Sequence, residues 1–202
     1  MNADTRRKIV MAAMDLFAEK GFQSTSVADI LSRTQAHSGS LYHFFPGKQD
    51  VLAAVLEAYR DGIEEWLLAP AWEGVDDPIG RIFALLSLYR THLLTSECTY
   101  GCPIGSLALE LHEPDPRIRD LLAVNFANWT SAIERCLDEA GARLPATLDR
   151  RGLAEFILTV MEGAVMQART YRDVGYFDRS IFMLRGQFDM LMAAANPETA
   201  DA

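Results

Sequence analysis

The chain has 202 residues, of which half are apolar, and this is enough for one or two domains with a buried core. Three cysteines do not make a disulfide framework, so a reducing cytoplasm is the expected location. A net charge of −9 argues against nucleic-acid binding until the distribution of the charge along the chain is considered.

The acidity belongs to the later part of the chain. Up to Asp50 there are six Lys and Arg residues against five Asp and Glu, whereas the remainder has thirteen Arg against twenty-three acidic residues. The first fifty residues are therefore free to meet an anionic partner. Residues 1–8 are polar and basic with no apolar run behind them, which argues against a signal peptide. Glu155 and Glu162 interrupt the most apolar stretch, so we expect no membrane span.

Nearly every segment has helical periodicity and no long run alternates with period two, so the predicted fold class is all-α. Gly21 is well placed just past the end of the first helix, and Thr25 or Ser26 can cap a second, short helix. Pro46 and Gly47 separate the third helix from the fourth. The longer segments expected to be helical are residues 5–20, 37–44, 48–68, 79–94, 118–140, 148–173 and 179–195, with a further short helix ending at Leu111.

Three short helices followed by a tight break suggest a helix-turn-helix unit. The helix of such a unit that enters the major groove needs small polar residues at its start, and Ser38, Gly39 and Ser40 meet that need. Leu41 and Phe45 can pack the same helix onto its own bundle. The alternative is that the rings simply fill a small core and the serines form a loop.

Three residues after this start suit contacts with phosphate. Tyr42 and His43 carry rings that can hydrogen-bond a phosphate while their bodies rest on protein. Lys48 stands at a helix start, where its ammonium and the exposed backbone N–H groups can share one phosphate.

The first fifty residues resemble the DNA-binding region of the TetR family of transcriptional repressors. The ordered pattern Gly-x-Leu-Tyr-x-x-Phe-x-x-Lys, from Gly39 to Lys48, is the most specific part of the resemblance. Further matching positions are Ile9, Ala12, Ala13, Leu16, Phe17, Gly21, Phe22, Thr25, Ser26, Val27 and Ile30.

The resemblance implies an all-helical homodimer with an N-terminal helix-turn-helix domain, expected over residues 1–47. An effector-binding and dimerisation domain is expected over residues 48–195, followed by a flexible tail over residues 196–202. Carried over by position, Thr25, Tyr42, His43 and Lys48 would contact phosphate. The full set of expected DNA-binding residues is Thr25, Ser26, His37, Ser38, Gly39, Ser40, Tyr42, His43 and Lys48.

Two positions depart from the family pattern. Gln35 stands where the family often has Gly at the turn, so it is expected to strain the turn slightly. His37 stands where the family often has Ser, and it alters both the helix cap and the groove-facing chemistry. The operator sequence therefore cannot be transferred from relatives.

The later part of the chain resembles the LmrA/YxaF-like subgroup of the family. The resemblance rests on the string GCPIGSLALEL, on DPRIR, and on the long helix with Phe126 and Trp129. It suggests a small, largely apolar or aromatic effector, whose pocket needs apolar walls and a few polar groups. The alternative for each candidate is an ordinary core residue. The candidate pocket residues are Phe83, Leu86, Tyr89, His92, Cys102, Asn125, Phe126, Trp129, Phe156, Met161, Met166 and Arg169.

The last two helices are expected to form a dimer interface, as a four-helix bundle built from two subunits. Small residues would let another helix approach closely, and large apolar residues would add area. The alternative is packing within one chain. The expected interface residues are Gly163, Ala164, Ala168, Phe182, Phe188, Leu191 and Met192.

No catalytic, cofactor or metal site is predicted. Cys98 and Cys102 are four residues apart, but no zinc-like set of ligand pairs accompanies them, and nothing marks either thiol as reactive. Glu110 and His112 lie beside a chain break, where a solvated role is expected.

The sequence thus predicts a cytoplasmic, ligand-responsive repressor whose partners are a palindromic DNA operator, a small effector and a second copy of the chain. The alternatives are an activator, or a small-molecule-binding helical protein without repressor function.

Overall fold

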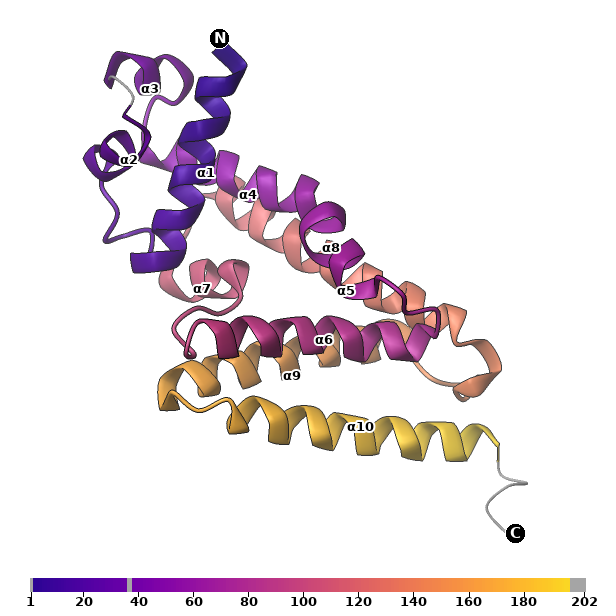
Figure 1. Cartoon of the computed structure of the whole chain (residues 1–202). Coiled ribbons are helices and arrows are strands. Elements are labelled where there is room, and N and C mark those ends of the chain that lie inside the picture. The colour runs from indigo at the N-terminus through magenta and orange to yellow at the C-terminus, as the bar shows by residue number, and fades with distance from the viewer. Residues whose placement is uncertain (1, 36–37, 197–202) are drawn as a thin grey trace. The chain divides into compact units, whose positions relative to one another are not determined.

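The computed structural model describes residues 2–35 and 38–196, and every regular element in these ranges is helical (Figure 1), as predicted. The α-helices are α1 (Asn2–Lys20), α2 (Val27–Thr34), α3 (Ser38–Phe44), α4 (Lys48–Ile63), α5 (Ala69–Trp72), α6 (Pro78–Thr95), α7 (Pro103–Glu110), α8 (Pro116–Glu139), α9 (Arg150–Tyr171) and α10 (Gly175–Ala195). A π-helix, η1 (Glu64–Leu68), follows α4, and a 3-10 turn, η2 (Gly141–Arg143), follows α8.

The chain divides into two compact units. Unit 1 comprises Met1–Gly62 and Pro103–Phe126, and unit 2 comprises Ile63–Cys102 and Ala127–Ala202. This grouping puts α4, α7 and the first part of α8 together with the helix-turn-helix region. The boundary between the packed units therefore differs from the domain boundary expected between residues 47 and 48. That division stays a prediction about function. Apart from Asn196, the predicted tail lies outside the described residues.

Unit 1 is held together by the apolar positions that repeat at helical spacing. α1 packs on α2, α3 and α7 within this unit. The buried side chains of the helices in unit 1 recur every three or four residues, so they lie on one face of each helix. The buried side chains of unit 1 include Ile9, Leu16, Phe17, Ile30, Leu41, Phe45, Leu52 and Leu56.

The fourth helix differs from the single helix predicted over residues 48–68. α4 ends at Ile63, and the chain continues through the π-helix η1 into α5. Pro70 lacks the N–H that a continuing α-helix would direct at the carbonyl of Trp66, which favours a changed hydrogen-bond pattern there. The boundary between units 1 and 2 falls between Gly62 and Ile63, just before this π-helix.

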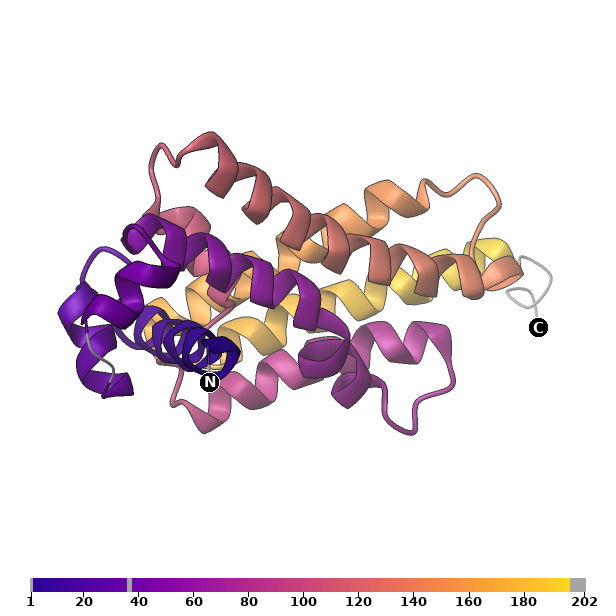
Figure 2. The same ribbon diagram turned by 90° about the horizontal axis from the view of Figure 1, so that it is seen from above.

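In unit 2, α6 packs with α9 and α10, and the last two helices lie side by side (Figures 1 and 2). α10 begins at Gly175, four residues before the start predicted at Arg179. Asp173 accepts a hydrogen bond from the Gly175 N–H, and Phe177 is 1% exposed, so the added turn is both bonded and buried. Across the described residues, no helix has a stretch whose length and hydropathy would suit a bilayer.

Candidate nucleic-acid interface and effector site

The turn between α1 and α2 starts at Gly21, whose φ of 84° lies in the left-handed region that glycine adopts at low cost. The Gly21 N–H donates to the carbonyl of Phe17, which ends α1 as predicted. The chain then turns through residues 22–25 to reach α2.

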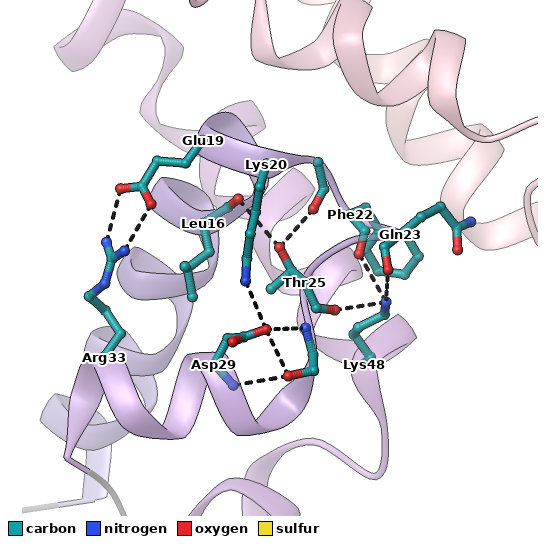
Figure 3. A network of polar contacts seen from close by, with 11 residues as sticks. Leu16, Glu19, Lys20, Phe22, Gln23, Thr25, Asp29, Arg33 and Lys48 are labelled. Carbon is teal, nitrogen blue, oxygen red and sulfur yellow. Dashed lines mark hydrogen bonds and ion pairs between the residues drawn. The ribbon is translucent and has the colours of Figure 1, made fainter.

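Thr25 lies inside this turn rather than on its surface. Its side chain is 1% exposed, and its hydroxyl lies 2.7 Å from the carbonyl oxygen of Gly21 and 3.3 Å from that of Leu16 (Figure 3). The hydroxyl therefore joins the end of α1 to the start of α2. The expected phosphate contact of Thr25 stays a prediction, and this geometry gives the residue a structural role of its own.

Ser26 caps α2 with a complete capping box. The Asp29 N–H donates to Ser26 Oγ at 3.1 Å, and the Ser26 N–H donates to Asp29 Oδ2 at 2.7 Å. Lys20 pairs with the same carboxylate at 2.9 Å, so α1 and α2 share one anion (Figure 3). The bond from Lys20, followed by those from Ser26, holds the pKa of Asp29 well below its usual range.

α3 divides into a buried face and an exposed face. Leu41 is fully buried and Phe45 is 2% exposed, so the packing role predicted for both is confirmed. Tyr42 is 55% exposed, His43 is exposed, and a Cβ added at Gly39 would meet no atom within 4 Å. A bare position and two polar rings thus lie at the surface of one short helix.

The Lys48 ammonium points back into the turn. Its Nζ lies 2.9 Å from the carbonyl oxygens of Phe22 and Thr25, 3.5 Å from that of Gln23, and 4.2 Å from the centre of the Phe22 ring (Figure 3). An ammonium has three N–H donors, and three carbonyls receive them here. The expected contact of this ammonium with phosphate stays a prediction, and it requires the network to open.

The expected departures at Gln35 and His37 have different outcomes. Gln35 adopts a φ of 54°, the left-handed conformation that explains why glycine suits this turn. His37 lies outside the described residues, and Ser38 begins α3 with its side chain undescribed.

Unit 2 contains a buried polar cluster made of Tyr89, Cys102, Trp129 and Glu162. Burial raises the pKa of Tyr89 well above its ordinary value, and the neighbouring Cys102 and Glu162 raise it further. Burial also raises the pKa of Glu162, against a bond from Cys102 that lowers it. Among the described residues, Trp129 Nε1 and Glu162 Oε1 are buried without a well-formed hydrogen bond, and the Trp129 N–H lies near enough to the Tyr89 hydroxyl to lower the pKa of Tyr89 against the other effects. Each such atom costs about 1–3 kcal/mol unless another group satisfies it.

Three of the predicted pocket residues, Tyr89, Cys102 and Trp129, thus come together, and sequence reasoning missed Glu162. The sequence signal for Glu162 is an acid inside the otherwise apolar stretch of α9. The other candidates are dispersed. Phe83, Leu86 and Met161 are buried in unit 2, His92, Phe156 and Met166 are exposed, Arg169 donates to the Thr99 carbonyl, and Asn125 and Phe126 belong to unit 1.

The expected dimer residues also divide by burial. Ala164, Ala168 and Phe188 are at most 1% exposed, and Phe188 packs on Phe83 of α6, so packing within the single chain accounts for their burial. Gly163 faces open space, and Phe182 is 74% exposed. Leu191 and Met192 are half-buried. Two exposed methionines of α10, Met183 and Met190, were missed, although they recur with Phe182 at helical spacing.

The three cysteines are buried and free of disulfides. Burial raises the pKa of Cys136 to about 11, which makes its thiol a poor nucleophile at neutral pH. Within residues 2–35 and 38–196, no group of three or more His, Cys, Asp or Glu side chains is placed to hold a metal.

Two family models match the chain. Residues 9–55 match the model of bacterial regulatory proteins of the tetR family. Residues 78–180, about half of the chain, match the C-terminal domain of LmrA/YxaF-like transcriptional regulators. The chain belongs to the TetR family. It is accordingly a DNA-binding transcriptional regulator, and the predicted family and subgroup are confirmed.

Curated relatives are similar in sequence to this chain along most of its length. The uncharacterised regulator YxaF of Bacillus subtilis is 29% identical over 170 residues, covering 84% of this chain and 87% of YxaF. The regulator LmrA of the same organism is 31% identical over 141 residues, covering 68% of this chain and 73% of LmrA.

Solved structures agree on the TetR fold. The regulatory protein TetR from Rhodobacter sphaeroides is 26% identical, with a TM-score of 0.79 over 88% of this chain and 95% of that one. A TetR-family regulator from Agrobacterium tumefaciens has a TM-score of 0.80 at 22% identity, over 95% of this chain and 99% of its own, and supports the fold alone.

Proposed function

We propose that this TetR-family regulator is a repressor that binds a palindromic operator as a homodimer and is released by a small, largely apolar effector. The observation that carries the proposal is the exposed face of α3, where Gly39, Tyr42 and His43 lie at the surface. A helix with a bare start can approach base edges, and the adjoining polar rings can reach phosphate. The site of action is the cytoplasm.

The exposed face of α3 supports a division of roles among the expected DNA-binding residues. Residues 37–40 would face the bases, and Tyr42 and His43 would contact phosphate. Thr25, Ser26 and Lys48 would act mainly by holding the turn, since their polar groups already bond the protein.

The exposed apolar side chains of α10 support the dimer. Phe182, Met183 and Met190 are each at least 68% exposed, and their spacing puts them on neighbouring positions of one helix face. Large exposed apolar patches mark interaction surfaces. Two copies joined through α9 and α10 would form a four-helix bundle and hold two α3 helices roughly 34–36 Å apart, one turn of DNA.

The buried polar cluster of unit 2 supports an effector with an apolar body and a polar group. Trp129 Nε1 offers a donor and Glu162 Oε1 an acceptor, and neither has a well-formed hydrogen bond among the described residues. An effector would release DNA only if it bound the released state better than the DNA-bound state, so operator DNA would weaken effector binding by the same factor.

A gel shift tests the proposal. The probe is the DNA upstream of the protein's own coding sequence, with the same fragment scrambled as the control. We expect specific retardation and in vitro transcription that falls as protein is added. Rising transcription would show an activator, and no retardation of any genomic fragment would overturn the proposed function.

Sedimentation equilibrium tests the dimer. We expect Phe182→Glu to raise the dimer dissociation constant at least tenfold, on the order of the cost of burying an unpaired charge at an interface. The control is Leu109→Glu on α7, because Leu109 is 75% exposed and Phe182 is 74% exposed. Equal dissociation constants for the two variants would remove α10 from the interface.

A further inference from the structure

The turn between α1 and α2 is bonded on its N–H side by a carboxylate that is distant in sequence. The Phe22 N–H donates to Glu110 Oε2 at 2.9 Å, and the Gln23 N–H donates to Glu110 Oε1 at 2.6 Å. Both oxygens of one carboxylate thus bind two successive amides. Hydrogen bonds to an ionised acceptor are stronger than neutral ones. The solvated role expected for Glu110 is wrong, because the side chain is engaged with the protein backbone.

Gly21 makes this approach possible. A Cβ added at Gly21 would lie 2.9 Å from Glu110 Oε1 and 3.0 Å from Oε2, so the carboxylate would have to shift from its place. The glycine therefore serves the left-handed turn and leaves room for the carboxylate at the same time.

Lys48 bonds the C=O side of the same turn. The backbone N–H of Phe22 thus donates to the Glu110 carboxylate at 2.9 Å. The backbone carbonyl of the same residue accepts from the Lys48 ammonium, also at 2.9 Å. The Thr25 carbonyl also lies 2.9 Å from the Lys48 ammonium, and the next residue, Ser26, caps α2. The turn that sets the direction of α2 is therefore fixed between one carboxylate from α7 and one ammonium from α4.

α7 links this turn along the chain to the polar cluster of unit 2. The helix begins at Pro103, directly after Cys102, and ends at Glu110. Eight helical residues span about 12 Å. Cys102 thus directly precedes the first residue of α7, and Glu110 is the last residue of that helix.

We propose that Glu110 is a positioning residue for DNA binding, which holds the α1–α2 turn in the geometry that presents α3, and that α7 carries a displacement at Cys102 to it. The inference rests on the proposed function and adds the route by which the effector acts. An effector that bonds Trp129 and Glu162 shifts Cys102, and the carboxylate of Glu110 leaves the amides of Phe22 and Gln23. The turn then loses its fixed direction, and α3 loses its place on the operator.

Amide hydrogen exchange of the full-length protein tests the contact without DNA. Glu110→Gln keeps the shape of the side chain but directs one NH₂ group at a backbone N–H. We expect exchange at Phe22 and Gln23 to become about tenfold faster, with the amides of α9 unchanged. The control is Glu113→Gln, which removes an exposed acid three residues farther along the chain. Unchanged exchange at Phe22 and Gln23 would overturn the proposal.

Fluorescence anisotropy with the upstream DNA fragment tests the consequence. We expect Glu110→Gln to weaken binding about tenfold, a typical size for residues that couple sites without touching a ligand. The salt slope should match the wild type, because no phosphate contact is lost. If the wild type binds and the variant binds equally well, the positioning role fails while the proposed function stands. If the wild type binds no DNA, the proposed function itself fails.

Cys102→Ala tests the route along α7. We expect faster exchange at Phe22 and Gln23 in this variant, although the substituted residue belongs to unit 2. In the Glu110→Gln background the same substitution should add less than it does in the wild type, because the contact on which it acts is already lost. Fully additive effects of the two substitutions would overturn the route.

Discussion

The helix-turn-helix region and the polar cluster of unit 2 use polar groups in opposite ways. Around the turn before α2, the Thr25 hydroxyl, the Lys48 ammonium and the Asp29 carboxylate each bond to groups of the protein. In unit 2, Trp129 Nε1 and Glu162 Oε1 have no well-formed hydrogen bond among the described residues. Under the proposed function, the first arrangement fixes a shape before DNA arrives, whereas the second keeps hydrogen-bonding capacity for an effector.

The largest effect should come from filling the bare position on α3. We expect Gly39→Leu to leave the fold intact, because a Cβ there meets no atom within 4 Å. If the start of α3 faces the major groove, as we propose, a bulky side chain there would reduce specific binding towards the non-specific level, on the order of a thousandfold. Anisotropy with the upstream DNA fragment measures the loss.

Gly39→Ala is the matched control for that change. It adds one methyl group and raises helix propensity, so it should be slightly more stable and should bind nearly as well as the wild type. If Gly39→Leu binds as tightly as Gly39→Ala, residue 39 does not face DNA, and the pre-organised surface lies elsewhere.

A smaller effect should come from removing the hydrogen bonds of the buried Thr25 hydroxyl. We expect Thr25→Val to lower the free energy of unfolding by about 1–3 kcal/mol, because the carbonyls of Leu16 and Gly21 lose a buried donor. Urea unfolding measures the change. The slope of log affinity against log salt concentration should stay at the wild-type value, because an uncharged hydroxyl releases no counterions from DNA.

Thr25→Ser is the control, since it keeps the hydroxyl and removes only the methyl group. Weaker DNA binding by Thr25→Val than by Thr25→Ser, with unchanged stability, would show that the hydroxyl contacts DNA and that the closed turn opens on binding.

The fold and the helix-turn-helix region were predictable because each rests on local patterns. Helical spacing gave the burial of Leu41 and Phe45, and the motif placed Tyr42 at the surface. The direction of the Lys48 ammonium was not predictable, because the carbonyls that receive it lie more than twenty residues away and no local pattern encodes them. Glu110 was missed for the same reason, since its amide partners are 87 and 88 residues distant. In unit 2, apolar residues at helical spacing look alike whether they line a pocket or fill a core.

The pH dependence of stability tests the polar cluster of unit 2. Burial raises the pKa of Glu162 above its ordinary 4.5, so its carboxyl holds a proton more tightly in the folded state than in the unfolded one. The associated stability is present below the unfolded pKa and is lost as pH rises through the folded pKa. Glu162→Gln removes this titration. The variant should therefore gain on the wild type as pH rises above 4.5, by up to about 1.4 kcal/mol per pH unit between the two pKa values.

Urea unfolding at a series of pH values measures this difference, and Glu65→Gln, at an exposed position, reports the effect of removing one surface charge. A constant difference between Glu162→Gln and the wild type from pH 4 to pH 8 would show that Glu162 is solvated, and the cluster would lose its acceptor.

The smallest effect concerns Gln35, which follows α2 with a backbone in the left-handed region. Gln35 has a φ of 54° and a ψ of 25°, and a left-handed backbone costs a residue with a side chain about 1–2 kcal/mol. Glycine removes that cost but loses more entropy on folding, so Gln35→Gly should raise the free energy of unfolding by about 0.5–1 kcal/mol. The same substitution at Gln167, exposed within α9, should lower it by about 1 kcal/mol. Opposite signs for one chemical change isolate the backbone as the cause. If Gln35→Gly also lowers the free energy of unfolding, the glutamine side chain itself stabilises the turn before α3.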